Sequence, residues 1–185
     1  MERIKIAPIL TKIKKELALH PYDAAHDLNH HLRVFRGSRK IVAAEHLNAD
    51  NKVLTIAAWG HDLVGRTGQE TKELKKFLEE FGCSNDFIAK ILLVIEEHSF
   101  GKKQTGVESR VLFDADKLEY VNPLRLTSFI QAAHRGLLDK NAVQHYLKEW
   151  HERVYRIPNM LHYSYSKKEF MRLLPAAERI MKKLH

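Results

Sequence analysis

The spacing of apolar residues is the feature that most limits what this chain can fold into. Ile6, Ile9, Leu10, Ile13 and Leu17 recur at intervals of three and four, which is the period of one face of an α-helix. The same period returns along the rest of the chain, and no window alternates as a half-buried strand would. We therefore expect an all-α fold. The later ranges predicted to be helical are about 50–63, 70–81, 87–97, 107–121, 124–137, 141–156 and 167–183.

Capping residues and prolines predict where several of these helices begin and end. The second helix should begin after Asp23 and carry both His26 and His30. Pro8 favours a later start for the first helix than its apolar period suggests. The other signals are Asp50 or Asn51 as the cap of 50–63, Asn85 or Asp86 as the cap of 87–97, and Pro175 as a kink or break in 167–183. Residues 157–165 form the least regular segment.

The composition fits one domain of ordinary size. The chain has 185 residues, of which 44% are hydrophobic, so we expect a single domain with a substantial core over residues 1–185. No stretch approaches the roughly 18 consecutive apolar residues of a transmembrane helix, and we expect no membrane partner. The mixed N-terminal residues do not resemble a signal peptide. A single cysteine, Cys83, excludes an internal disulfide framework, and a reducing cytoplasm is the simplest compartment.

The formal net charge of +8 favours an anionic partner. The basic residues are scattered along the chain, without a dense arm or an aromatic-interleaved motif of the kind that binds RNA. We read most of them as solvated helix faces. The alternative is a positive rim around a pocket for a phosphate ester. Nucleic acid is therefore a possible partner but not the favoured one.

The adjacent pair His61-Asp62 is the strongest indication of chemistry. It follows the apolar helical run 53–60, where a solvated polar face is not expected. Neighbouring helical residues point about 100° apart, so both side chains can reach one ion only if it sits at the helix end or edge. The alternative is a hydrogen-bonded polar pair at a helix C-terminus.

Two further clusters lie on other predicted helices. His26 and His30 are four residues apart and would share one helical face, although a single such histidine can also be a hydrogen-bonded core residue. Asp114 and Asp116 follow an apolar stretch, and only one of the two can easily share a site with His61. We prefer Asp116, because apolar residues surround it.

Histidine, histidine-aspartate and aspartate on separate helices can converge on one divalent cation. The ligand set would be two imidazoles and two carboxylates, which leaves coordination positions for water and substrate. Ligation by nitrogen and oxygen without a thiolate suits Mn²⁺, Fe²⁺, Co²⁺, Ni²⁺, Zn²⁺ or Mg²⁺. The pattern favours a metal-dependent hydrolase.

The order His30, His61-Asp62, Asp116 resembles the HD-domain phosphohydrolase superfamily. Residues 26–34 are similar to the first motif of its small single-domain bacterial members, and residues 114–118 are similar to their last motif. The resemblance covers a core of about 19–121, and residues 122–185 would complete one helical HD domain. It implies a compact helical bundle in which His30, His61, Asp62 and Asp116 are the metal ligands. In the family the aspartate before the basic residue is the ligand, which supports Asp116.

The resemblance also implies roles for other residues around a phosphorylated substrate. Asp62 would bind the ion and accept a hydrogen bond from the attacking water, and Lys117 would neutralise charge on the phosphoryl group. His98 would face the pocket, where it could bind a phosphate oxygen, act as a general acid or join a second metal. The expected substrate-binding residues are His26, Arg33 and Arg66. Several relatives place an acidic residue shortly after the His-Asp pair. Residues 63–66 of this chain contain none, so another base, or the metal alone, must activate the water.

The substrate expected from this resemblance is a small anionic phosphorylated metabolite, in particular a nucleotide, which a metal-activated water hydrolyses at a phosphoester or phosphoanhydride bond. One alternative is a catalytically weak or regulatory module that binds a nucleotide. A di-iron oxygenase is a further alternative, but it needs extra histidines between residues 62 and 116, and only His98 lies there. The sequence leaves the oligomeric state open.

Overall fold

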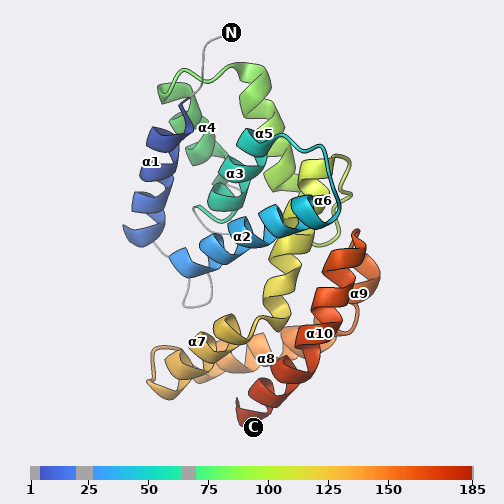
Figure 1. The fold of residues 1–185 in the computed structure, drawn as a ribbon. Helices are drawn as coiled ribbons and strands as arrows, with labels where there is room; N and C mark the ends of the chain where they lie inside the picture. Colours follow the sequence, from blue (N-terminus) through green and yellow to red (C-terminus); the bar gives the residue numbers. More distant parts are fainter. Residues whose placement is uncertain (1–4, 20–26, 64–69, 185) are drawn as a thin grey trace.

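Every regular element in the described part of the chain is a helix (Figure 1). The structure is a computed structural model that describes residues 5–19, 27–63 and 70–184. Its helices are α1 (Ile6–Leu19), α2 (Leu28–Ala44), α3 (Asn51–Gly60), α4 (Glu70–Glu80), α5 (Asn85–Glu97), α6 (Val107–Lys117), η1 (Leu118–Val121), α7 (Pro123–His134), α8 (Lys140–Val154), α9 (Ile157–Met160), α10 (Ser164–Met181) and η2 (Lys182–Leu184). The all-α prediction is confirmed.

The helices α2, α3, α5 and α6 pack on one another and position the candidate site (Figure 1). The apolar run of α3 is almost wholly buried, and Asp50 caps its first turn by accepting hydrogen bonds from the backbone N–H groups of Lys52 and Val53. This burial anchors the C-terminal end of α3, where His61 follows. Gly60 is buried against Leu74 of α4, and a Cβ atom there would lie 3.0 Å from a Leu74 methyl carbon.

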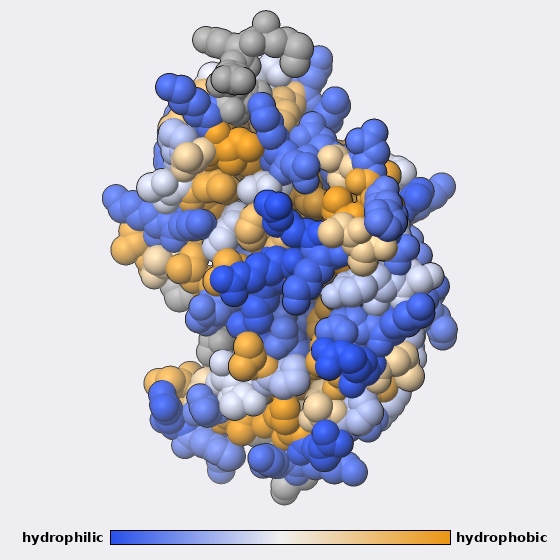
Figure 2. All heavy atoms as spheres, in the orientation of Figure 1, coloured by the Kyte–Doolittle hydropathy of each residue, from blue (hydrophilic) through white to orange (hydrophobic). Residues whose placement is uncertain are grey.

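The C-terminal helices pack at the far end of α6. Here α10 contacts η1, α7 and α2, while Trp150 of α8 is buried and donates its indole N–H to the Tyr120 carbonyl at 2.7 Å. Figure 2 shows hydrophilic side chains gathered across the middle of one face, where α2 lies. The exposed basic residues of α2 are Arg36, Arg39 and Lys40. None of the described helices is long and apolar enough to span a membrane.

Several predicted boundaries were wrong. The second helix begins at Leu28, with Asp27 rather than Asp23 as its cap, because the Asp27 carboxylate accepts from the His30 N–H at 2.9 Å. His26, predicted to share a helical face with His30, lies outside the described residues. Ser84, not Asn85 or Asp86, caps α5 through a bond from the Phe87 N–H.

Other differences concern prolines and helix ends. Pro8 lies in the first turn of α1, where backbone N–H groups have no partner within the helix and proline is tolerated. Pro175 lies inside a continuous α10, which begins at Ser164 and so is neither split nor delayed to residue 167. The predicted helix 107–121 changes from α to 3₁₀ geometry after Lys117. The irregular segment 157–165 contains the short helix α9.

Candidate metal centre

His61 follows the buried helix α3, and a hydrogen bond to that helix fixes the orientation of its ring. The Nδ1 atom lies 3.0 Å from the carbonyl oxygen of Ala58, one turn earlier. Because a carbonyl oxygen only accepts, Nδ1 must carry the proton. The other ring nitrogen, Nε2, therefore presents a lone pair to the space between α3, α2 and α6.

His30 lies in the first turn of α2 and is fully buried. Its Nδ1 atom lies 3.3 Å from Oε2 of Glu119, and its Nε2 atom lies 3.2 Å from Nε2 of His61. A carboxylate also only accepts, so Nδ1 of His30 carries a proton as well. Burial lowers the pKa of His30, but hydrogen bonds to Asp62 and Glu119 outweigh burial and raise it. A positive charge between the two Nε2 atoms is therefore favoured, and a proton or a metal cation can supply it.

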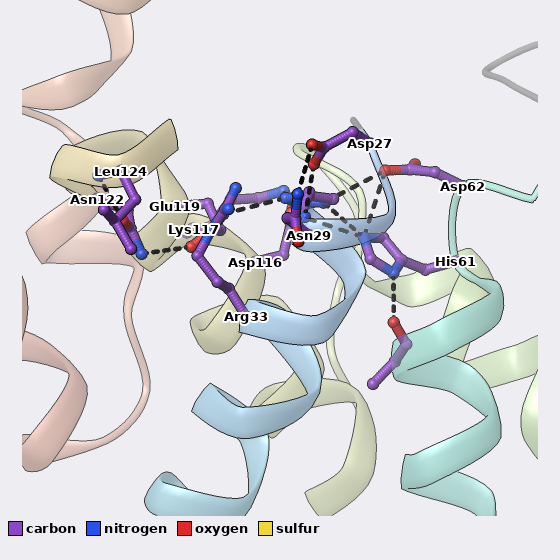
Figure 3. A network of polar contacts seen from close by, with 12 residues as sticks. Asp27, Asn29, Arg33, His61, Asp62, Asp116, Lys117, Glu119, Asn122 and Leu124 are labelled. Carbon is purple, nitrogen blue, oxygen red and sulfur yellow. Dashed lines mark hydrogen bonds and ion pairs between the residues drawn. The ribbon is translucent and has the colours of Figure 1, made fainter. Parts of the chain in front are cut away.

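Two carboxylates lie beside this pair of nitrogens (Figure 3). Oδ2 of Asp62 is 3.6 Å from His30 Nε2 and 3.3 Å from His61 Nε2. Oδ1 of Asp116 is 3.6 Å and 3.8 Å from the same two atoms. Both side chains are about 12% exposed, so the centre is enclosed but open to solvent on one side. The structure thus brings His30, His61, Asp62 and Asp116 together.

Asp114 does not share this site. It is fully buried, and its carboxylate accepts from the backbone N–H groups of His162 and Tyr163 at 3.0–3.1 Å. These bonds hold the segment between α9 and α10 against α6. The two acidic residues of the motif therefore point to different sides of one helix, and only Asp116 faces the histidines.

Lys117 is buried and its ammonium lies 2.5 Å from Oδ2 of Asp116. Its charge also lies over the ring of Phe100, 4.3 Å from the centroid. Burial raises the pKa of Asp116, but Lys117 and His61 outweigh burial and hold that pKa well below its usual range. Asp116 is therefore an ionised carboxylate at neutral pH, with one oxygen bound by Lys117 and the other facing the histidines.

His98 follows α5 and packs edge-on against His61, with ring centroids 5.1 Å apart. Its Nδ1 atom bonds to the Ile95 carbonyl, so its Nε2 atom is also the unprotonated nitrogen when the ring is neutral. Burial, together with the nearby His61 and Lys117, lowers the pKa of His98 to about 4. At neutral pH His98 is therefore an acceptor, which argues against a role as general acid.

Arg33 and Glu119 form an ion pair at the edge of the centre. Nε of Arg33 donates to Oε2 of Glu119 at 2.8 Å, and the Arg33 side chain is 17% exposed. Sequence reasoning did not assign a function to Glu119. The available signal was its position three residues after Asp116, a spacing that keeps both carboxylates on one side of a helix. His26 and Arg66, both predicted to bind substrate, lie outside the described residues.

The four side chains suit a divalent cation. Metal bonds of about 2.0–2.2 Å place adjacent ligand atoms about 3.0–3.5 Å apart, close to the separations between these histidines and carboxylates. His30, His61 and Asp62 offer ligand atoms that all lie within 4.8 Å of one another. Cys83 is a buried core residue, so the set contains nitrogen and oxygen only, as in Mn²⁺, Fe²⁺, Co²⁺, Ni²⁺, Zn²⁺ or Mg²⁺ sites.

Comparisons with known proteins show where this fold recurs. No family model matches the sequence, and no curated protein sequence matches it. A protein from Lactobacillus plantarum is 18% identical with a TM-score of 0.77, over 100% of this chain and 96% of that one. Bacillus subtilis YpgQ in complex with ADP is 20% identical with a TM-score of 0.67, over 97% and 96%.

A third similar structure carries a superfamily name. A predicted HD superfamily hydrolase from an uncultured Thermotogales bacterium is 20% identical with a TM-score of 0.65, over 100% of this chain and 94% of that one. At these identities the likeness concerns the fold. The described chain thus has the all-α fold of an HD domain, as the sequence motifs predicted.

Proposed function

Starting from this HD-domain fold, we propose that the chain is a metal-dependent phosphohydrolase. It cleaves a phosphoester or phosphoanhydride bond of a nucleotide or another small phosphorylated metabolite. The observation that carries the proposal is the pair of inward-facing Nε2 atoms of His30 and His61, 3.2 Å apart, with the carboxylates of Asp62 and Asp116 beside them. Such a set is costly to bury without a cation to bind.

The residues around the centre would have different roles. His30, His61, Asp62 and Asp116 would hold the ion. A bound divalent ion supplies a Lewis acid that polarises a phosphoryl oxygen and lowers the pKa of water. Asp62, whose side chain is partly exposed, can also accept a hydrogen bond from the attacking water. His98 offers a second acceptor, because its Nε2 atom is unprotonated at neutral pH.

Positive charge on one side of the centre suits an anionic substrate. Lys117 places its ammonium beside Asp116, and Arg33 uses Nε for Glu119 while its side chain remains partly exposed. These two cations, with the predicted contribution of Arg66 and His26, would bind phosphoryl oxygens and stabilise the charge that develops on them. The complex of YpgQ with ADP supports a nucleotide as the first substrate class to test.

The test combines elemental analysis of the purified protein with a phosphate-release screen. Nucleoside mono-, di- and triphosphates are assayed with Mn²⁺, Co²⁺, Ni²⁺, Zn²⁺ and Mg²⁺, and pyrophosphate is scored separately from phosphate. About one transition metal per chain with nucleotide hydrolysis supports the proposal. Bound metal without hydrolysis of any phosphate ester favours a regulatory module. Two irons per chain favour an oxygenase, and no binding of any metal contradicts the proposed centre.

A further inference from the structure

Glu119 lies three residues after Asp116, in the short helix η1, and its side chain is only 3% exposed. Three side chains donate to it. Oε2 accepts from Nε of Arg33 at 2.8 Å and from Nδ1 of His30 at 3.3 Å, and Oε1 accepts from Nδ2 of Asn122 at 2.7 Å. Both carboxylate oxygens are therefore fixed in direction (Figure 3).

We infer that Glu119 is a positioning residue for the metal centre, which holds the His30 ring with its proton on Nδ1 and its Nε2 lone pair directed at the ion. This inference rests on the proposed metal-dependent function. Glu119 itself contacts neither the substrate nor the ion in this proposal. Its effect on metal affinity passes through His30, to which it is bonded.

His30, unlike His61, needs a side-chain acceptor to orient its ring. His61 is held by the carbonyl of Ala58, which belongs to its own buried helix and is present whatever the side chains are. His30 lies in the first turn of α2, and the acceptor at its Nδ1 atom comes from η1, across the helix interface. The ring orientation of His30 thus depends on a residue 89 positions away in the chain.

Arg33 and Asn122 offset the free-energy cost of burying the Glu119 carboxylate. A carboxylate buried without partners would be protonated or would move toward water. Arg33 lies one turn after His30 on α2 and supplies the compensating charge from the same helix. Asn122, the cap of α7, fixes the second oxygen and links η1 to the next helix. Partners of this kind around metal-binding histidines typically contribute 10–100-fold to metal affinity.

The experiment measures Zn²⁺ affinity by competition with a chromophoric chelator, so activity is not the readout. Glu119→Ala should weaken Zn²⁺ binding about 10–100-fold. Glu119→Gln should recover part of the loss, because its carbonyl oxygen can still accept from Nδ1 of His30. Glu97→Ala is the matched control. Glu97 is also a buried glutamate, but its carboxylate binds Thr105 and not a metal ligand.

Wild-type affinity in a folded Glu119→Ala variant overturns the inference, as does an equal loss in Glu97→Ala. If Glu119→Ala does not fold, the inference is tested on the wild-type protein instead. In the Zn²⁺-loaded protein with ¹⁵N-labelled histidine, the His30 ring must bind through Nε2 and keep its proton on Nδ1. Binding through Nδ1 overturns the inference. A wild-type protein that binds no metal instead overturns the proposed function itself, so the two failures are distinguishable.

Discussion

The Nε2 atoms of His30 and His61 lie 3.2 Å apart, although 31 positions separate the two residues in the chain. Each ring is tethered at Nδ1 by an acceptor, Glu119 for one and the Ala58 carbonyl for the other. The two tethers turn both Nε2 atoms toward the same point. Loss of either histidine should therefore remove one of the two nitrogen atoms that face the proposed ion.

His61→Ala should abolish metal-dependent hydrolysis and lower metal affinity by more than the 10–100-fold that a supporting residue contributes. The substitution removes one of the two nitrogen atoms that face the proposed ion. Hydrolysis and Zn²⁺ affinity are measured side by side, with His134→Ala, an exposed histidine on α7, as the control. Full activity in His61→Ala would contradict the site.

Asp116→Asn and Asp114→Asn should produce opposite profiles. Asp116→Asn should lose metal binding and hydrolysis while the protein stays folded, because Asp116 faces the two histidines. Asp114→Asn should keep the metal but lower the free energy of unfolding by about 1–3 kcal/mol, because the amide NH₂ group that replaces one carboxylate oxygen cannot accept from the buried backbone N–H groups. Metal content and urea denaturation of both variants check this. If Asp114→Asn lost the metal and Asp116→Asn kept it, Asp114 would be the ligand in place of Asp116.

Lys117→Ala should lower kcat by about 100-fold, the typical effect of removing one group that stabilises transition-state charge. Metal should remain bound, because Lys117 contacts the Asp116 oxygen that faces away from the histidines. Steady-state kinetics and elemental analysis measure the two effects separately. Exposed Lys168, on α10, gives the control variant Lys168→Ala. An unchanged kcat would remove Lys117 from the mechanism.

Adding Zn²⁺ or Mn²⁺ should raise the melting temperature of the metal-free protein, and a chelator should reverse the rise. An ion that binds only the folded state stabilises it by about 2.7 kcal/mol at a hundred times its dissociation constant. Calorimetry of the wild-type protein and of His61→Ala provides the comparison. The same rise in both proteins would place the bound ion elsewhere.

Glu97 should stabilise the protein at neutral pH and lose this effect in acid. Burial raises the pKa of Glu97, but hydrogen bonds from Ser109 and Thr105 outweigh burial, so the folded pKa lies below its usual value of 4.5. A lowered pKa means that the stabilisation is present above pH 4.5 and disappears as the pH falls through the folded pKa. Glu97→Gln should therefore cost about 1–3 kcal/mol at about pH 7.

Urea denaturation of the wild-type protein and Glu97→Gln at about pH 7 and about pH 3.5 measures the difference. The gap in unfolding free energy should be smaller at the lower pH. Asp86→Asn, an exposed carboxylate in the first turn of α5, is the control. A gap that is independent of pH would show that hydrogen bonding to Thr105 does not require the charge.

Local sequence patterns were enough to predict the helical class and the residue types at the centre. Apolar spacing defines which face of each helix is buried, and this information is local, so the helices containing Ile9, Ile56 and Leu112 could be predicted directly. Capping was less predictable, because Asp23 and Asp27 are chemically equivalent in the sequence, and only the backbone path selects Asp27.

Tertiary structure decided which of these side chains meet. Asp114 and Asp116 look alike in the sequence. In the fold, Asp114 accepts hydrogen bonds from backbone N–H groups before α10, whereas Asp116 lies beside the histidines. Glu119 acquires its role only because η1 lies against α2, so that an acceptor reaches Nδ1 of His30. Distances of this kind depend on contacts between residues far apart in the chain, and periodicity within one helix carries no information about them.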